Sequence, residues 1–256
     1  MKLHHVDLGG DGKPPLAILP GLLGSAKNWR TAGAGLSQSF HVFALDLRNH
    51  GGSPHAPDMS FEAMSADVVQ WLEEQRLPRA TLLGHSMGGK VAMRLACKLP
   101  DQVERLCVVD IAPKPYPVDR AAFDAMLSID VGRLESRRDA EALLREAIPD
   151  REMRQFVLSN LVRRETGRLE WQVNLPAIAA ALPAVRSVPL DPGDRFEGPT
   201  LFVVGGKSRF VVPEDHEMIR GHFPGARIEV IQEAGHHPHA EARAAFVETV
   251  AAFAAV

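Results

Sequence analysis

The sequence predicts an α/β protein with a mostly parallel, doubly wound sheet and an inserted helical cap, and three observations support this prediction. Short apolar segments of β type alternate with amphipathic segments of helical length. Several of the β segments are apolar on nearly every residue, as are strands buried on both faces of a sheet. The alternation stops between residues 113 and 198. We therefore expect a core of residues 1–112 and 199–256, interrupted by a cap of residues 113–198.

The expected strands are short apolar runs with turn residues at their ends. They cover residues 16–19, 42–47, 80–83, 106–111, 200–204 and 228–231. Between the second and the third, apolar residues recur at helical spacing from Phe61 to Trp71, and Ser60 is placed to cap that helix. A second helix is expected over residues 91–99, ended by Pro100.

The insertion opens with a proline-rich connector, Pro113-Lys-Pro-Tyr-Pro117, and carries no run of β type. Helical patterns cover residues 133–148 and 152–162, with acidic and basic side chains in balance. Such a balance indicates solvated helix faces rather than a binding patch. A helical insertion between two strands of one sheet should cover one end of that sheet like a lid.

The composition excludes several classes of protein. Of 256 residues, 45% are hydrophobic and 24% charged, and the net charge of −3 favours neither nucleic acid nor an anionic membrane as partner. No apolar run reaches the about 18 residues that insert in a bilayer, and the N-terminal MKLHHVDLGG lacks the apolar segment of a signal peptide. Cys97 and Cys107 lie in apolar segments and are expected as buried free thiols. We therefore expect a cytoplasmic protein; the sequence carries no signal for an oligomeric state.

The central motif is Gly84-His85-Ser86-Met87-Gly88, a G-x-S-x-G between an expected strand and an expected helix. A sharp turn there strains the serine backbone and lifts its hydroxyl clear of the sheet. Gly84 and Gly88 leave room for the turn, because a Cβ at either position would collide with its neighbours. We predict Ser86 as a nucleophile; the alternative is a glycine-rich connection with an incidental serine.

A serine at its ordinary pKa is a weak nucleophile, so a base must lie beside it. Among eleven histidines, His236 follows the last expected strand, in a loop that ends at the same carboxyl edge of the sheet as Ser86. His237 and His239 lie nearby, so a metal site is an alternative. Their spacing matches neither a helical nor a zinc-finger pattern, and we predict His236 as general base with no metal.

An oxyanion hole needs two backbone N–H groups aimed at the developing negative charge. Met87, directly after the nucleophile, offers one of them. The other is expected from Leu22, in the loop Pro20-Gly-Leu-Leu-Gly-Ser25 after the first strand. Taken without Ser86, the same loop reads as a plain glycine turn.

Five segments in this order resemble the α/β-hydrolase superfamily, which implies the α/β-hydrolase fold. They are Gly21-Leu-Leu-Gly-Ser25 with Asn28-Trp29, Asp46-Leu-Arg-Asn-His-Gly51 with Ser53-Pro54, Gly84-His-Ser-Met-Gly-Gly-Lys90, Val109-Asp-Ile-Ala-Pro113 and Gly235-His236. The match is nearest to small bacterial esterases and thioesterases related to mammalian mitochondrial hydrolases with an abhydrolase domain. The resemblance covers about residues 16–240 and implies the same roles for Ser86, Met87, Leu22 and His236. It also implies that the loop from Asp46 shapes the rim of the site, with Asp46 and Arg48 as structural residues.

The acid of the triad departs from the superfamily pattern. Most relatives carry an aspartate after the seventh strand, where this chain reads Gly205-Gly-Lys-Ser-Arg-Phe-Val-Val-Pro213, with Ser208 or Arg209 at the position of the acid. An acid is still needed to fix the tautomer of His236 and to stabilise its imidazolium form. The resemblance to relatives with Val-Asp-Ile-Ala-Pro implies Asp110 for this role. The alternative is that Asp110 only caps the connector to the cap.

Together these residues predict a serine hydrolase that cleaves carboxylic esters or thioesters of small to medium acyl chains through an acyl-enzyme, without a cofactor. In the cap, Trp171 and Asn174 are expected to bind the substrate opposite Leu23, although packing within the cap is an equal alternative for Trp171. A C–C bond hydrolase or a cofactor-free haloperoxidase would use the same triad. A ligand-binding receptor on a hydrolase scaffold is the alternative from another class. A dehalogenase is disfavoured, because it would carry an aspartate in place of Ser86.

Overall fold

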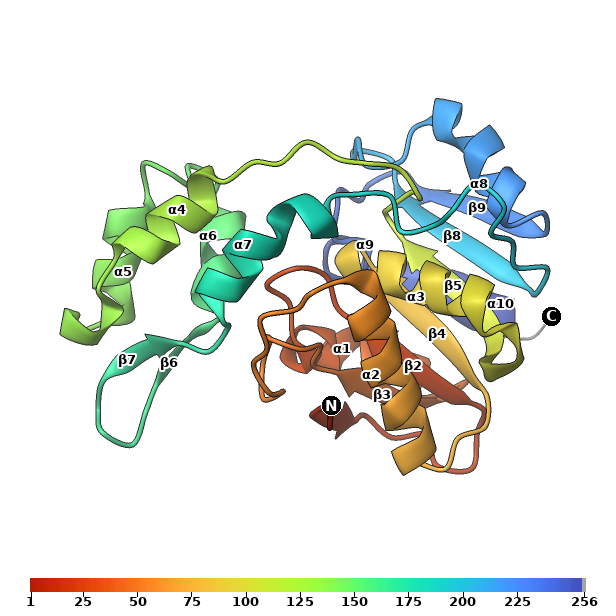
Figure 1. Cartoon of the computed structure of the whole chain (residues 1–256), viewed down its shortest axis with the longest axis horizontal. Coiled ribbons are helices and arrows are strands. Elements are labelled where there is room, and N and C mark those ends of the chain that lie inside the picture. The colour runs from red at the N-terminus through yellow and green to blue at the C-terminus, as the bar shows by residue number, and fades with distance from the viewer. Residues whose placement is uncertain (255–256) are drawn as a thin grey trace.

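A sheet of seven strands forms the centre of the computed structural model, which describes residues 1–254 (Figure 1). The strand order is β1-β3-β2-β4-β5-β8-β9, in which β1 pairs antiparallel with β3 and all other pairs are parallel. The prediction of a mostly parallel sheet is confirmed. The strands are β1 His5–Asp7, β2 Pro15–Leu19, β3 His41–Leu45, β4 Ala80–His85, β5 Val103–Val109, β8 Thr200–Gly205 and β9 Ala226–Ile231.

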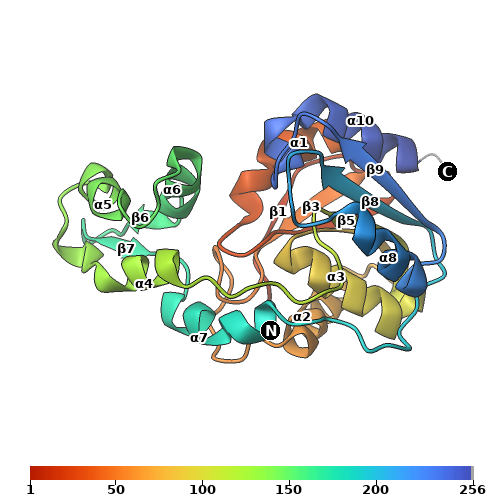
Figure 2. The ribbon, with the colours of Figure 1, turned by 90° about the horizontal axis from the view of Figure 1, so that it is seen from above.

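Helices cover both faces of this sheet (Figure 2). On one face α1 and α10 pack over a buried cluster that includes Trp29 and Phe246, and α2, α3 and α8 lie on the other face. Residues buried on both faces explain why the strands are apolar without alternation. The helices of the core are α1 Arg30–Leu36, α2 Phe61–Glu74, α3 Met87–Lys98, α8 His216–His222, α9 Pro238–Glu241 and α10 Arg243–Ala254.

Two helices of the core, α2 and α3, can be compared directly with the helices expected from the sequence. The hydroxyl of Ser60 accepts a hydrogen bond from the Ala63 N–H at 3.2 Å, which satisfies a free amide of the first turn of α2 and confirms the expected cap. The expected apolar face of α2, from Phe61 to Trp71, is buried. α3 begins at Met87 rather than at residue 91, because the chain enters the helix directly after Ser86.

Between β5 and β8 the chain leaves the sheet and forms a separate group of helices (Figure 1). The expectation of an insertion without strands is wrong, because β6 and β7 pair as an antiparallel hairpin. Strands of three residues are too short to show an alternating pattern, and the first of them overlaps the expected helix over 152–162. The elements of the insertion are α4 Ala121–Ser128, α5 Arg137–Leu144, α6 Arg151–Leu158, β6 Leu161–Arg163, β7 Leu169–Trp171 and α7 Leu175–Val185.

The ends of the strands differ from expectation in a way that matters for the site. β3 ends at Leu45 and β5 at Val109, two residues early in each case; the next side chains, Asp46 and Asp110, accept hydrogen bonds from the Ala26 and Gly205 N–H groups. Cys107 is buried, Cys97 is half-buried, and both thiols are free. None of the helices found within residues 1–254 has the length and apolar character needed to cross a membrane.

Candidate active site

Ser86 lies on a sharp turn between β4 and α3, at the carboxyl edge of the sheet. Its backbone has φ 51° and ψ −118°, a strained conformation for a residue with a side chain. A Cβ at Gly84 would lie 2.3 Å from the carbonyl oxygen of Gly88, and a Cβ at Gly88 would lie 2.1 Å from that of Leu19. Only glycine fits at these two positions, so the G-x-S-x-G motif builds the turn that presents the Ser86 hydroxyl.

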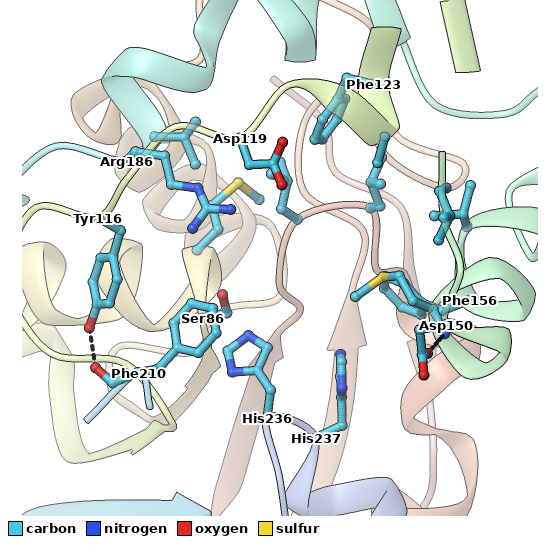
Figure 3. A pocket seen from close by; sticks show the side chains of 18 of the residues that line it. Ser86, Tyr116, Asp119, Phe123, Asp150, Phe156, Arg186, Phe210, His236 and His237 are labelled. Atoms are coloured by element: carbon cyan, nitrogen blue, oxygen red, sulfur yellow. Dashed lines mark hydrogen bonds between the residues drawn. The ribbon is translucent and has the colours of Figure 1, made fainter. Parts of the chain in front are cut away.

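His236 and Asp110 meet Ser86 from two other strand ends. The Nδ1 of His236 lies 2.7 Å from Oδ2 of Asp110, whose side chain is 0% exposed. Because a carboxylate only accepts hydrogen bonds, Nδ1 donates its proton and Nε2 keeps a lone pair. Ser86 and His236 both line one cavity (Figure 3). The structure thus brings the three residues together with His236 in the tautomer of a general base.

The end of β8 and the loop after it contact both Asp110 and His236, and the sequence analysis assigned no role to this loop. The Gly205 N–H donates to Oδ1 of Asp110 at 3.0 Å, and the Ser208 hydroxyl donates to Oδ2 at 2.5 Å. The ring of Phe210 stacks on that of His236, with 3.8 Å between centroids and 17° between planes. The sequence left Ser208 or Arg209 at the usual position of the acid, but no local pattern shows that the Ser208 hydroxyl reaches Asp110.

Three further histidines surround His236, and burial keeps them neutral. Burial lowers the pKa of His237 to about 4 and that of His239 to about 3, and it holds the pKa of His85 well below its ordinary value. The Nε2 of His85 donates to the carbonyl oxygen of His236 at 2.8 Å, since a carbonyl can only accept. His85 therefore fixes the backbone of the loop that carries the base, while His239 stacks on Trp29 at 3.9 Å.

Groups able to bind a metal lie elsewhere in the molecule. Among residues 1–254, the side chains with metal-ligand spacing are Asp7, Asp11 and His41, of which the two aspartates are exposed. They lie near the amino end of the sheet, away from Ser86. The histidines near Ser86 make hydrogen bonds and ring contacts: His236 bonds to Asp110 and stacks on Phe210, and His85 bonds to the His236 carbonyl.

The expected oxyanion loop is held from two sides. Within residues 1–254, neither the Leu22 N–H nor the Met87 N–H donates a hydrogen bond to another backbone group. Leu23 has φ 62°, and its N–H donates to Nε2 of His50 at 3.1 Å. Its carbonyl oxygen accepts from Nδ2 of Asn160, a buried residue of the insertion, at 2.9 Å. Sequence reasoning gave no role to His50 or Asn160, since each acts through a distant backbone group.

The cavity above Ser86 has a volume of about 330 Å³, within the range of small-molecule sites. Its lining comes from both the core and the insertion. Apolar side chains dominate, and four charged ones stand among them: Lys90, Asp119, Asp150 and Arg186. The apolar lining includes Leu22, Leu23, Met87, Ile111, Phe123, Ile148, Phe156, Val157, Val185 and Phe210.

Trp171 and Asn174 do not line this cavity, contrary to expectation. The side chain of Asn174 accepts from the Ala177 N–H at 3.4 Å and donates to Oδ1 of Asn49 at 3.0 Å, so it caps α7 and fastens it to the core. Trp171 lies in the β6–β7 hairpin, opposite Leu161, and is partly buried against the hydrophobic core. Leu23, the third residue expected to bind the substrate, does line the cavity.

Comparison with known proteins decides the family. The model of the alpha/beta hydrolase fold family matches residues 14–242. The chain belongs to this family. The hydrolase is 39% identical to the sn-1-specific diacylglycerol lipase ABHD11 of Mus musculus, over 97% of this chain and 83% of the mouse protein. It is 34% identical to Esterase YbfF of Escherichia coli (strain K12), over 89% of this chain and 87% of the bacterial one.

The three-dimensional match is equally extensive. A solved structure titled "Marine microorganism esterase" superposes on this hydrolase with a TM-score of 0.95, at 34% identity and over 99% of each chain. The agreement extends over the insertion as well as the sheet, because 99% of the chain is covered. The expected family is therefore confirmed.

Proposed function

We propose that the chain is a serine hydrolase that acts on carboxylic esters, with Ser86 as nucleophile, His236 as general base and Asp110 as the acid that orients it. One observation supports this most strongly: the 2.7 Å contact from His236 Nδ1 to a fully buried Asp110, in a cavity shared with Ser86. The names of the similar proteins, a lipase and an esterase, point to the same class of substrate.

The reaction would proceed in two steps. The Oγ of Ser86 attacks the carbonyl carbon and passes its proton to Nε2 of His236, while the Leu22 and Met87 N–H groups receive the oxyanion. His236 then protonates the leaving alcohol, and the C–O bond to it breaks to give an acyl-enzyme. Water attacks the acyl carbon, gives its proton to His236, and releases the acid as the proton returns to Ser86. Thioesters would follow the same steps with a thiol as leaving group.

The cavity supports acyl chains of small to medium length. Its volume of about 330 Å³ is modest, and most of its lining is apolar, with Leu23 on the core side and Phe156 on the side of the insertion. We propose the core as residues 1–112 and 199–256 and the cap as residues 113–198, with the cap forming one wall of the acyl site.

Labelling with a fluorophosphonate, together with turnover of chromogenic esters of increasing chain length, tests the proposal. We expect wild type to be labelled once and to turn esters over, and Ser86→Ala to lose both while remaining folded by circular dichroism. The matched control is Ser37→Ala, which removes the hydroxyl of a half-buried serine that donates to the Ala34 carbonyl. Labelling that survives in Ser86→Ala would overturn the nucleophile. Tight ester binding without turnover would favour a receptor.

A further inference from the structure

We propose that the cavity above Ser86 contains a binding site for a carboxylate on the acyl part of the substrate, and that Arg186 is the residue that binds it. The substrates selected at this site are monoesters of dicarboxylic acids. The inference rests on the proposed function, in which the cavity receives the acyl chain of an ester. It adds to that function the class of acyl chain that the hydrolase prefers.

Four charged side chains line the cavity, and three of them are engaged in structural hydrogen bonds. The Nζ of Lys90 donates to two backbone carbonyl oxygens. The carboxylates of Asp119 and Asp150 each accept from an N–H group in the first turn of a helix, α4 and α6 respectively, at 2.9 and 2.7 Å. Arg186 is the charged lining residue that remains for a ligand.

The guanidinium of Arg186 has no partner among residues 1–254. It makes neither a hydrogen bond nor an ion pair there, although the residue is half-buried. Arg94, which is also half-buried, pairs with Glu62 at 2.6 Å and donates to the Pro189 carbonyl at 3.0 Å. Arg186 follows α7 directly and could bind the free carbonyls at the end of that helix, but it donates to none of them. Its side chain extends into the cavity instead (Figure 3).

The backbone of Arg186 is fixed from two sides. Its N–H donates to the Leu182 carbonyl at 2.9 Å, and its carbonyl oxygen accepts from the Tyr116 N–H at 2.8 Å. Tyr116 belongs to the segment that leads into the insertion, and Arg186 belongs to the segment that leads out of it. The guanidinium is therefore carried by a fixed part of the cavity wall, so a ligand has to order only the side chain.

A second cation adds to the positive potential around Arg186. The ammonium of Lys90 is buried and lines the same cavity. The pKa of Lys90 falls to about 7, first because the group is buried and then because of the positive charge of Arg186. The two cations therefore repel each other, and neither forms an ion pair with a carboxylate of residues 1–254. An anion bound at Arg186 relieves this repulsion.

The lining of the cavity favours a carboxylate over a phosphate. A guanidinium presents its N–H groups in a planar fork that matches the two oxygens of a carboxylate. Asp119 and Asp150 line the same cavity, and their negative charges repel a dianion more strongly than a monoanion. Most of the remaining lining is apolar and suits the methylene groups between an ester and a terminal carboxylate.

The test compares 4-nitrophenyl monoesters of dicarboxylic acids, from glutaric to suberic acid, with the matching esters in which an amide replaces the free carboxylate. The two series have the same size and differ in charge. We expect wild type to prefer the acidic ester by about 10-fold in kcat/KM at the best chain length. Arg186→Met should bring this ratio to about one, mainly by raising KM for the acidic esters, because the contact is equally strong in the ground state and the transition state.

Arg94→Met is the matched control. It removes another half-buried arginine, one that bonds to the segment leading out of the insertion but does not line the cavity. Its ratio should equal that of wild type. Arg186→Lys keeps the charge without the planar fork and should keep part of the preference. If Arg186→Met does not fold, Arg186→Gln also removes the charge and should give the same ratio of about one.

The same assays separate a failure of this inference from a failure of the proposed function. A ratio near one in wild type, or an unchanged ratio in Arg186→Met, refutes the carboxylate site and leaves the hydrolase intact where the amide esters are turned over and Ser86→Ala is inactive. Equal losses on acidic and amide esters in both Arg186→Met and Asp119→Asn also refute it, because they would assign Arg186 to a structural pair with Asp119. A wild type that turns over neither series rejects the proposed function, and this inference with it.

Discussion

The sheet and the insertion hold their parts of the site in different ways. In the sheet, backbone hydrogen bonds position the residues of the site. The Ser86 N–H donates to the Val109 carbonyl at 3.1 Å, and the Asp110 N–H donates to the Val203 carbonyl. The insertion consists of helices of eight to eleven residues and strands of three. Helices of this length are marginal by themselves, so their position depends on packing and on contacts with the core.

A few side chains make those contacts. The Nζ of Lys90 donates to the carbonyl oxygens of Lys114 and Ser187, at 3.0 and 2.5 Å, and so ties the two connectors of the insertion to α3. Asn160 reaches the oxyanion loop, and Asn174 reaches the loop that carries Asn49. We infer that the core governs the chemistry and the insertion governs selectivity, and that these tethers are among the contacts that couple the two. Variants in the core and in the insertion test whether chemistry and selectivity are separated in this way.

The largest effect is expected from the acid in the core. Asp110→Asn keeps the shape but favours the wrong tautomer of His236, because an amide can donate to Nδ1. By analogy with the serine proteases, kcat should fall by up to about 10⁴-fold. Steady-state kinetics with a short chromogenic ester, and circular dichroism to show that the variant is folded, measure this.

Two acids just beyond Pro213 serve as matched controls. Asp215 accepts hydrogen bonds from the Lys114 ammonium at 2.6 Å and from the Val212 N–H at 2.9 Å, so its carboxylate is committed away from His236. Glu214 is exposed. Asp215→Asn and Glu214→Gln should each keep near-normal turnover. Collapse in Asp215→Asn beside normal turnover in Asp110→Asn would restore the usual position of the acid after β8.

A smaller effect is expected where the insertion touches the oxyanion loop. Asn160→Ala removes the donor to the Leu23 carbonyl, so the strained loop is held by His50 alone and the Leu22 N–H loses alignment. We expect kcat to fall about 10-fold with little change in KM, since the oxyanion forms only in the transition state. The inhibition constant of a boronic acid that mimics this state should rise in proportion.

Asn174→Ala is the control for this tether. It also cuts a hydrogen bond between the insertion and the core, to Asn49, but it leaves the Leu23 backbone untouched. Its kcat should stay near that of wild type. Equal losses in both variants would mean that any loosening of the insertion slows the reaction, and the special role of Asn160 would be rejected.

The insertion should control chain length with no effect on the chemistry. Phe156 lines the cavity from α6, so Phe156→Ala adds volume and should shift preference toward longer acyl groups. Such a change is worth about 10-fold in the ratio of kcat/KM between a long and a short ester. Trp171→Ala, outside the cavity, should leave the ratio unchanged. A shift in Trp171→Ala instead would show that the acyl site extends under the β6–β7 hairpin.

The sequence predicted the core of the site because that part depends on local signals. Ser86, Asp110 and His236 each follow a recognisable strand, and parallel strands bring their carboxyl ends to one edge. Met87 and Leu22 follow from the same turns. The identity of Asp110 as the acid came from resemblance, since its contact with His236 joins residues 126 positions apart.

The insertion was harder to predict for a physical reason. Its helices have eight to eleven residues, and the cavity lies between the insertion and the core, so periodicity alone does not tell which buried residues meet the cavity. The sequence therefore pointed to Trp171 and Asn174, whereas Phe156 and Asn160 lie closer to the chemistry. The Ser208–Asp110 bond was hidden for a similar reason, because it spans 98 positions and depends on the β5–β8 pairing.

The smallest effect concerns the Lys90 tether and appears in stability rather than in turnover. Burial lowers the pKa of Lys90 from 10.5 to about 7. Between these values the unfolded chain binds a proton that the folded chain does not, so folding gains stability as pH rises, by at most about 1.4 kcal/mol per pH unit. Below about pH 7 both states are protonated, and this contribution stops changing. In urea unfolding between about pH 6 and pH 9, the free energy of unfolding of wild type should therefore rise relative to that of Lys90→Met only above neutral pH.

Lys98→Met is the control. It removes an exposed lysine whose pKa is raised by its bonds to Asp194 and Asp191, so the difference in free energy of unfolding between it and wild type should stay constant over the same pH range. A flat difference for Lys90→Met as well would show that the tether keeps one protonation state, and that the link between core and insertion does not respond to pH.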